Sequence, residues 1–137
     1  MMRMRVAEGT QFVLATVMCG FILVSWGMAE EPLRYNRDIR PLLAEYCFTC
    51  HGPDSAARKA ELRLDQRDVA VARGAILEGN PDGGELVARI ESTDPDLVMP
   101  PHETKKKLSR HERNVLRRWV AEGAAYEQHW SLVTPER

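Results

Sequence analysis

The sequence predicts one small all-α domain behind an N-terminal export segment. Apolar residues recur at helical spacing in two segments, and a capping box begins the second of them. Only a short piece around Leu62 and Leu64 alternates as a strand would. A chain of 137 residues suffices for one modest domain. Its net charge of -1 excludes a strongly basic nucleic-acid binder as the default class.

Residues 1–29 are predicted to be a secretory signal peptide. Arg3 and Arg5 precede an apolar, uncharged run over residues 12–29. Gly27 and Ala29 then give the small-x-small pattern of a cleavage site. We therefore expect an exported protein, periplasmic or at the cell surface, whose domain occupies residues 30–137.

An uncleaved N-terminal anchor over residues 12–29 is the alternative. The apolar run is long for a signal peptide and shorter than the roughly 20 residues of a spanning helix. A lipoprotein site at Cys19 is a poorer match, because Met18 and the residues before it do not fit the usual pattern.

Asn36 to Cys50 is predicted to be the first helix of the domain. Asn36 suits an N-cap, although Pro41 would then lie just beyond the first turn, and a regular helix starting near Pro41 is the alternative. The apolar stripe that predicts this helix consists of Ile39, Leu42, Leu43 and Tyr46.

Two short helices are predicted in the middle of the chain. One covers Gln66 to Arg73, with Asp65 as its cap and Gly74 closing it. The other covers Glu85 to Ile90. The three prolines between Asp94 and Thr104 predict an ordered loop without a helix.

The last predicted helix follows the capping box of Ser109 and Glu112 and ends at Gly123. The lysine run over residues 105–107 is interpreted as a solvated loop, and residues 128–137 as a tail. The apolar face of this helix consists of Val115, Leu116, Trp119 and Val120.

Cys47-Phe48-Thr49-Cys50-His51 is a C-x-x-C-H motif, which predicts covalent attachment of a c-type haem. Thiols at i and i+3 lie on one helix face, where both can bond to the two vinyl groups at one porphyrin edge. His51 is then placed to bind the iron.

Three other interpretations compete for this motif. A thiol-redox site usually lies in a strand–helix unit, and no strand pattern precedes Cys47. A disulfide between Cys47 and Cys50 would close a very short loop. A zinc site would need Cys47, Cys50 and two of four histidines, and no paired spacing supports it. Those histidines are His51, His102, His111 and His129.

Met99 is the candidate for the second axial ligand of the iron. It is the one methionine after the export segment, and Pro100 and Pro101 fix the backbone behind it. His102 is the rival ligand, whereas His111 and His129 are expected at the surface.

The sequence resembles the planctomycete-type cytochrome c domain over residues 33–131. The resemblance implies a class I-like cytochrome c fold around one covalent haem c. It implies that the haem is bound through Cys47, Cys50 and His51, with Met99 as the sixth ligand of the iron. Such domains usually precede further domains of longer secreted proteins. The matching segments are residues 35–43, 47–52, 62–65, 99–101, 108–109, 119, 123–124 and 129–130.

We therefore expect an electron-transfer module with no catalytic residues and no small-molecule substrate. Its expected partners are redox proteins and further domains or a membrane complex, without nucleic acid. A haem-based sensor or peroxidase-like domain with an open sixth position is one alternative, and a structural haem module is another. Haem burial should also stabilise the fold. The expected apolar wall consists of Ile39, Leu42, Leu43, Leu64, Leu86, Ile90, Leu97, Leu116, Trp119 and Val120.

Overall fold

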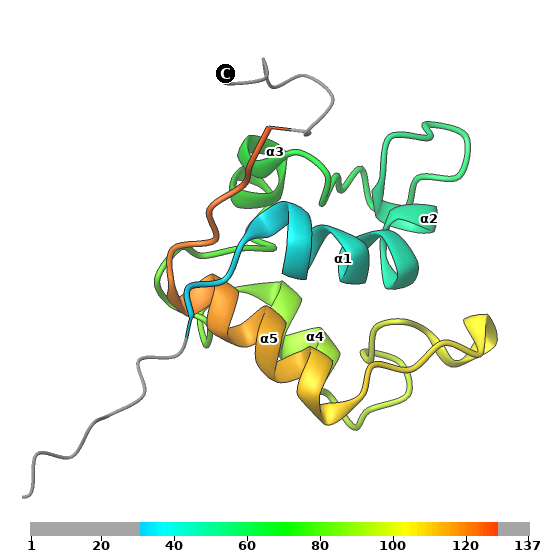
Figure 1. Ribbon diagram of the computed structural model, residues 1–137. Helices are drawn as coiled ribbons and strands as arrows, with labels where there is room; N and C mark the ends of the chain where they lie inside the picture. Colours follow the sequence, from blue (N-terminus) through cyan, green and yellow to red (C-terminus); the bar gives the residue numbers. More distant parts are fainter. Residues whose placement is uncertain (1–30, 129–137) are drawn as a thin grey trace, which may run out of the picture. The chain divides into compact units, whose positions relative to one another are not determined.

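The computed structural model describes residues 31–128, and all regular structure in this range is helical (Figure 1). The predicted all-α class is thus confirmed for the described residues. The predicted export segment, Cys19 and His129 lie outside them. Within residues 31–128, no helix is both long and apolar enough to cross a membrane. The elements are η1 (Tyr35–Ile39), α1 (Arg40–Tyr46), α2 (Phe48–His51), α3 (Arg67–Ala72), α4 (Glu85–Glu91), η2 (His102–Thr104) and α5 (Arg110–Ala121).

The predicted first helix is three consecutive pieces rather than one. A π-helical turn, η1, leads into α1, which begins at Arg40 with Pro41 in its first turn. Proline is tolerated there because the first amides of a helix have no intrahelical acceptor. The N-cap assignment for Asn36 is wrong, since this residue lies inside η1.

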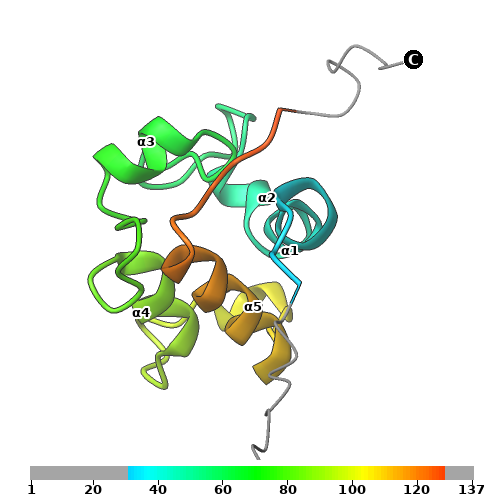
Figure 2. The ribbon, with the colours of Figure 1, turned by 60° about the vertical axis from the view of Figure 1, so that its left-hand side comes forward.

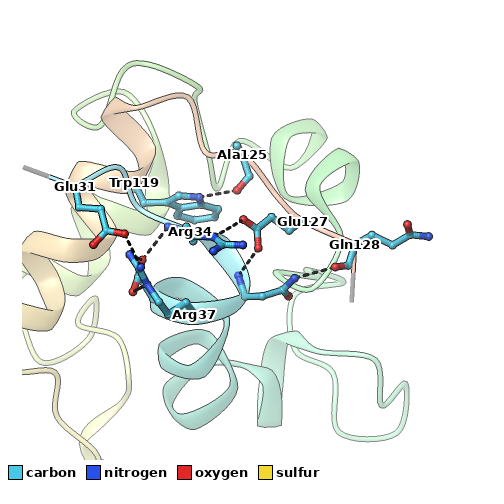
Figure 3. A network of polar contacts seen from close by, with 9 residues as sticks. Glu31, Arg34, Arg37, Trp119, Ala125, Glu127 and Gln128 are labelled. Carbon is cyan, nitrogen blue, oxygen red and sulfur yellow. Dashed lines mark hydrogen bonds and ion pairs between the residues drawn. The ribbon is translucent and has the colours of Figure 1, made fainter. Parts of the chain in front are cut away.

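Asn36 instead fastens η1 to the end of the described chain. Figure 3 shows the two residues at that end, Glu127 and Gln128. Its backbone N–H donates to Glu127 Oε2 at 3.0 Å, and its side-chain amide donates to the Gln128 carbonyl at 2.8 Å. Trp119 Nε1 donates to the Ala125 carbonyl at 2.9 Å on the same side of the domain. Segments about ninety positions apart in sequence are therefore held side by side.

The core is a single apolar cluster to which every helix from η1 to α5 except α2 and η2 contributes buried residues. Tyr35 packs against two other aromatic residues. Its ring stacks on that of Tyr126 at a centroid distance of 4.5 Å, and its centroid lies 6.0 Å from that of Trp119. Helices α4 and α5 lie side by side in both ribbon views (Figures 1 and 2). Buried hydrophobic residues are Tyr35, Ile39, Leu43, Leu64, Ala70, Ala75, Ile76, Leu86, Val87, Ile90, Leu108, Leu116, Trp119, Val120 and Ala124.

The capping box of α5 is confirmed. Glu112 N–H donates to Ser109 Oγ at 3.2 Å, and the Glu112 carboxylate accepts from Ser109 N–H at 2.6 Å. The same carboxylate accepts from the Tyr46 hydroxyl at 3.0 Å, so it also links α5 to the end of α1. Gly123 follows the helix with φ of +99°, as a closing glycine should.

The shorter helices agree with prediction in place but not in every detail. α4 matches the predicted span within one residue and buries its apolar face. α3 is shorter than predicted, and Asp65 does not cap it, because Asp65 forms an ion pair with Arg63. Gly74 does close α3, with φ of +69°.

Truncating Leu116 should destabilise the domain strongly. Its side chain is completely buried on α5, so Leu116→Ala removes core packing and leaves a cavity. We expect a loss of about 2–5 kcal/mol in the free energy of unfolding, measured by urea denaturation. Leu77 is 47% exposed, and Leu77→Ala should cost well under half as much. Equal losses for the two variants would contradict the assignment of the core.

Glu112→Gln should make the domain less sensitive to acid. Hydrogen bonds from Ser109, reinforced by Tyr46, lower the pKa of Glu112 in the folded protein. A depressed folded-state pKa stabilises the protein above the unfolded-state pKa, and this contribution disappears as the pH falls through the folded-state value. The variant should therefore lose less stability than the wild type between pH 7 and about pH 3 in urea titrations. An exposed carboxylate supplies the control, Glu103→Gln, whose acid sensitivity should match the wild type.

Candidate functional site

An apolar cavity of about 620 Å³ lies between the end of α1, α2, α4 and the segment that contains Met99. This volume is in the ordinary range for a bound organic ligand. Cys47, Cys50, His51 and Met99 all line it. The structure thus brings together the four residues that the sequence singled out, although Met99 is distant from the motif along the chain.

One turn of helix fixes the positions of the two thiols and the imidazole. Cys47 N–H donates to the Leu43 carbonyl at 2.9 Å, which joins the motif to α1. The backbone N–H groups of Cys50 and His51 both donate to the Cys47 carbonyl, with N···O distances of 3.1 and 2.8 Å. The turn closes at Gly52, where a Cβ would lie 2.3 Å from the Phe48 carbonyl oxygen, so a larger residue cannot fit without backbone movement.

The loop after the motif returns to hold His51 in place. Leu64 N–H donates to the His51 carbonyl and Lys59 N–H to the Cys50 carbonyl, both at 2.8 Å. His51 Nδ1 is buried and has no hydrogen-bond partner among the described residues. Burial lowers the pKa of His51, the Lys59 backbone opposes this shift, and the charge of Arg89 adds to it. The neutral imidazole that results is the form that binds metals.

The Cys47 thiol is poorly suited to redox chemistry of its own. Burial raises the pKa of Cys47 to about 12, so the thiol stays protonated at neutral pH. Reactive C-x-x-C cysteines have lowered pKa values instead, because the thiolate is the nucleophile. Cys47 and Cys50 are both free thiols in the structure.

The zinc alternative also lacks its ligand set in the described part of the chain. Within residues 31–128, no three side chains of His, Cys, Asp or Glu gather in a way that could hold a metal ion. A tetrahedral structural zinc site needs four such ligands.

The segment around Met99 is held by backbone hydrogen bonds. Met99 N–H donates to the Arg89 carbonyl at the end of α4, at 3.0 Å, and Val98 N–H donates to the Asp94 carbonyl at 2.9 Å. Pro100 is buried behind Met99. The predicted loop is confirmed except at its end, where the single 3₁₀ turn η2 forms.

His102 lies apart from the four residues. Its side chain is exposed and borders a neighbouring cavity of about 350 Å³, not the cavity that contains the cysteines. Met99 borders both cavities. His111 is exposed on α5, as expected of a surface residue.

The predicted apolar wall is too broad. Leu64, Leu86 and Ile90 do line the cavity. Leu97 is 47% exposed, because it lies in the turn that precedes Met99 rather than behind the cavity, and its assignment to the wall is wrong. The other six predicted wall residues fill the core or pack against it: Ile39, Leu42, Leu43, Leu116, Trp119 and Val120.

Charged residues at the cavity escaped the sequence analysis. Glu85 and Arg89 line it one turn apart on α4, with Arg89 Nε 2.9 Å from Glu85 Oε2. Lys59 and Lys106 line it from the two loops. The spacing of Glu85 and Arg89 beside Leu86 and Ile90 was the available signal, since these four positions share one side of a helix.

The comparisons with known proteins add one finding. The model of a family described as "Planctomycete cytochrome C" matches residues 47–103, which include the C-x-x-C-H motif, α3, α4 and Met99. Neither the search of curated proteins nor that of solved structures gave a match. The family match confirms the resemblance found in the sequence, and over residues 47–103 the chain is similar to the planctomycete cytochrome C family.

Proposed function

We propose that this protein is an electron-transfer cytochrome with one haem c bound through thioethers to Cys47 and Cys50. His51 would be one axial ligand of the iron and Met99 the other. The observation that supports this most directly is that all four side chains line one apolar cavity. A cytochrome c family implies a haem cofactor.

The residues of the cavity fit a haem. Its wall combines apolar side chains with two thiols on one helical turn, an imidazole and a thioether. Buried polar groups normally have hydrogen-bond partners. The buried Nδ1 of His51 has none among residues 31–128, which supports a bound group in contact with this imidazole.

A bound haem supplies one-electron chemistry, and the protein's part is to hold both iron ligands and exclude water. The turn from Cys47 to His51 would hold the haem through its thiols and imidazole, and hydrogen bonds to Leu43 and Leu64 support this turn. Met99 would supply the second iron ligand from a segment that its backbone hydrogen bond to Arg89 holds. Ligands held this firmly keep the geometry similar in both oxidation states, which favours electron transfer over ligand binding.

A carrier of this kind has no substrate and no catalytic residues. We propose redox proteins as its partners, together with further domains or a membrane complex. Export to the periplasm or cell surface, with residues 1–29 as a signal peptide or anchor, accords with the family. These assignments of partners and location depend on the electron-transfer proposal.

Replacing both motif cysteines should abolish covalent haem. Wild-type protein produced with haem-ligation machinery should keep its haem after denaturation, and its alkaline pyridine spectrum should report two thioethers. Cys47→Ser/Cys50→Ser should lose the haem entirely and unfold more readily. A variant that retains denaturation-resistant haem would refute attachment at this motif, and a wild-type protein without covalent haem would refute the whole proposal.

Met99→Ala should remove the sixth ligand, whereas His102→Ala should not. The ferric wild-type protein should show the weak far-red methionine–iron absorption band, lost in Met99→Ala and retained in His102→Ala. The reduced Met99→Ala protein should also bind carbon monoxide much faster, because its iron has an open position. Rapid carbon monoxide binding by the wild type would instead favour a gas sensor or peroxidase-like domain.

A further inference from the structure

The cavity is positively charged although the whole chain is slightly negative. Lys59, Arg89 and Lys106 line it, against the single carboxylate of Glu85. An apolar wall with an excess of cations suits a ligand that is mostly apolar and has acidic groups at one edge. Haem has this composition, since its macrocycle bears two carboxylates. A carboxylate that leaves water needs a hydrogen-bonded cationic partner.

Among the three cations, Arg89 is best placed to receive such a carboxylate. The Lys106 ammonium lies 2.9 Å from Glu45 Oε1 and donates to the Glu45 carbonyl, so it is drawn toward the exposed side of α1. Lys59 is exposed in the loop after the motif. Arg89 has its ion-pair partner, Glu85, on the wall of the cavity itself.

Arg89 is also connected to both proposed axial ligands. Its carbonyl accepts the Met99 N–H at 3.0 Å, and its charge acts on the His51 imidazole. The ion pair with Glu85 joins Arg89 Nε to Glu85 Oε2 at 2.9 Å, whereas a guanidinium has five N–H donors in all. A planar guanidinium with donors to spare can bind a second carboxylate in bidentate fashion.

We propose that Arg89 binds a haem carboxylate and, together with Glu85, sets the reduction potential of the site. This inference rests on the proposed function. Reduction adds one electron to the iron and breaks no bond, so the oxidised site has one more positive charge. A nearby cation disfavours that state and a nearby carboxylate favours it.

The two residues of the pair should therefore shift the potential in opposite directions. Arg89→Gln should lower the reduction potential and Glu85→Gln should raise it. If the substitutions only loosened the cavity and admitted water, both variants would shift the reduction potential in the same direction. The opposite signs therefore distinguish a charge effect from a structural one.

The experiment is a spectroelectrochemical titration of the purified, haem-loaded proteins. We expect Arg89→Gln to shift the ratio of reduced to oxidised protein at a fixed potential about tenfold, which is about 59 mV for one electron. Arg89→Lys should recover part of this shift, since it keeps the charge without the planar fork. Arg110→Gln is the control, because Arg110 is exposed on α5 and does not line the cavity, and it should leave the potential unchanged.

An infrared difference spectrum between the oxidised and reduced states supplies a second readout. The bands of an ion-paired haem carboxylate should shift in Arg89→Gln and not in Arg110→Gln. Covalent haem combined with an unchanged potential in Arg89→Gln, or with shifts of one sign in both pair variants, would overturn this inference alone. Absence of covalent haem from the wild type would instead refute the proposed function.

Discussion

The structure depends on how α1 is oriented, because one face of this helix borders both the core and the cavity. Ile39, the last residue of η1, and Leu43 in α1 are completely buried, and η1 packs against both α1 and α5. Cys47 follows at the same four-residue spacing, so it comes to the edge of the core where the cavity begins. Burial of two aliphatic side chains thereby determines which way the next turn faces.

The features that local sequence determines were predictable. The C-x-x-C-H motif lies on a helical turn because its own backbone bonds form within five residues. The capping box of Ser109 and Glu112 is likewise a short-range pattern that the structure reproduces. Chemistry at these positions follows from residue type and spacing, with no knowledge of the rest of the fold.

The features that depend on distant partners were not predictable. Asn36 has the side chain of a good N-cap, yet its hydrogen bonds go to Glu127 and Gln128 at the far end of the domain. Leu97 has the hydrophobicity of a wall residue, yet the turn before Met99 directs it to solvent. For Asn36, hydrogen bonds to distant residues outweigh an N-cap preference that is worth only about 1 kcal/mol.

The hydrogen bond between Tyr46 and Glu112 has a consequence for the motions of the domain. Tyr46 lines the cavity immediately before Cys47, while Glu112 closes the first turn of α5. Helix ends are where local opening is easiest, and such openings occur as cooperative units. Fraying at the start of α5 would break the hydrogen bond between Glu112 and the Tyr46 hydroxyl. The cavity rim at Tyr46 and the first turn of α5 should therefore open together. Solvent access to the cavity is thereby coupled to a helix end that contributes no side chain to its wall.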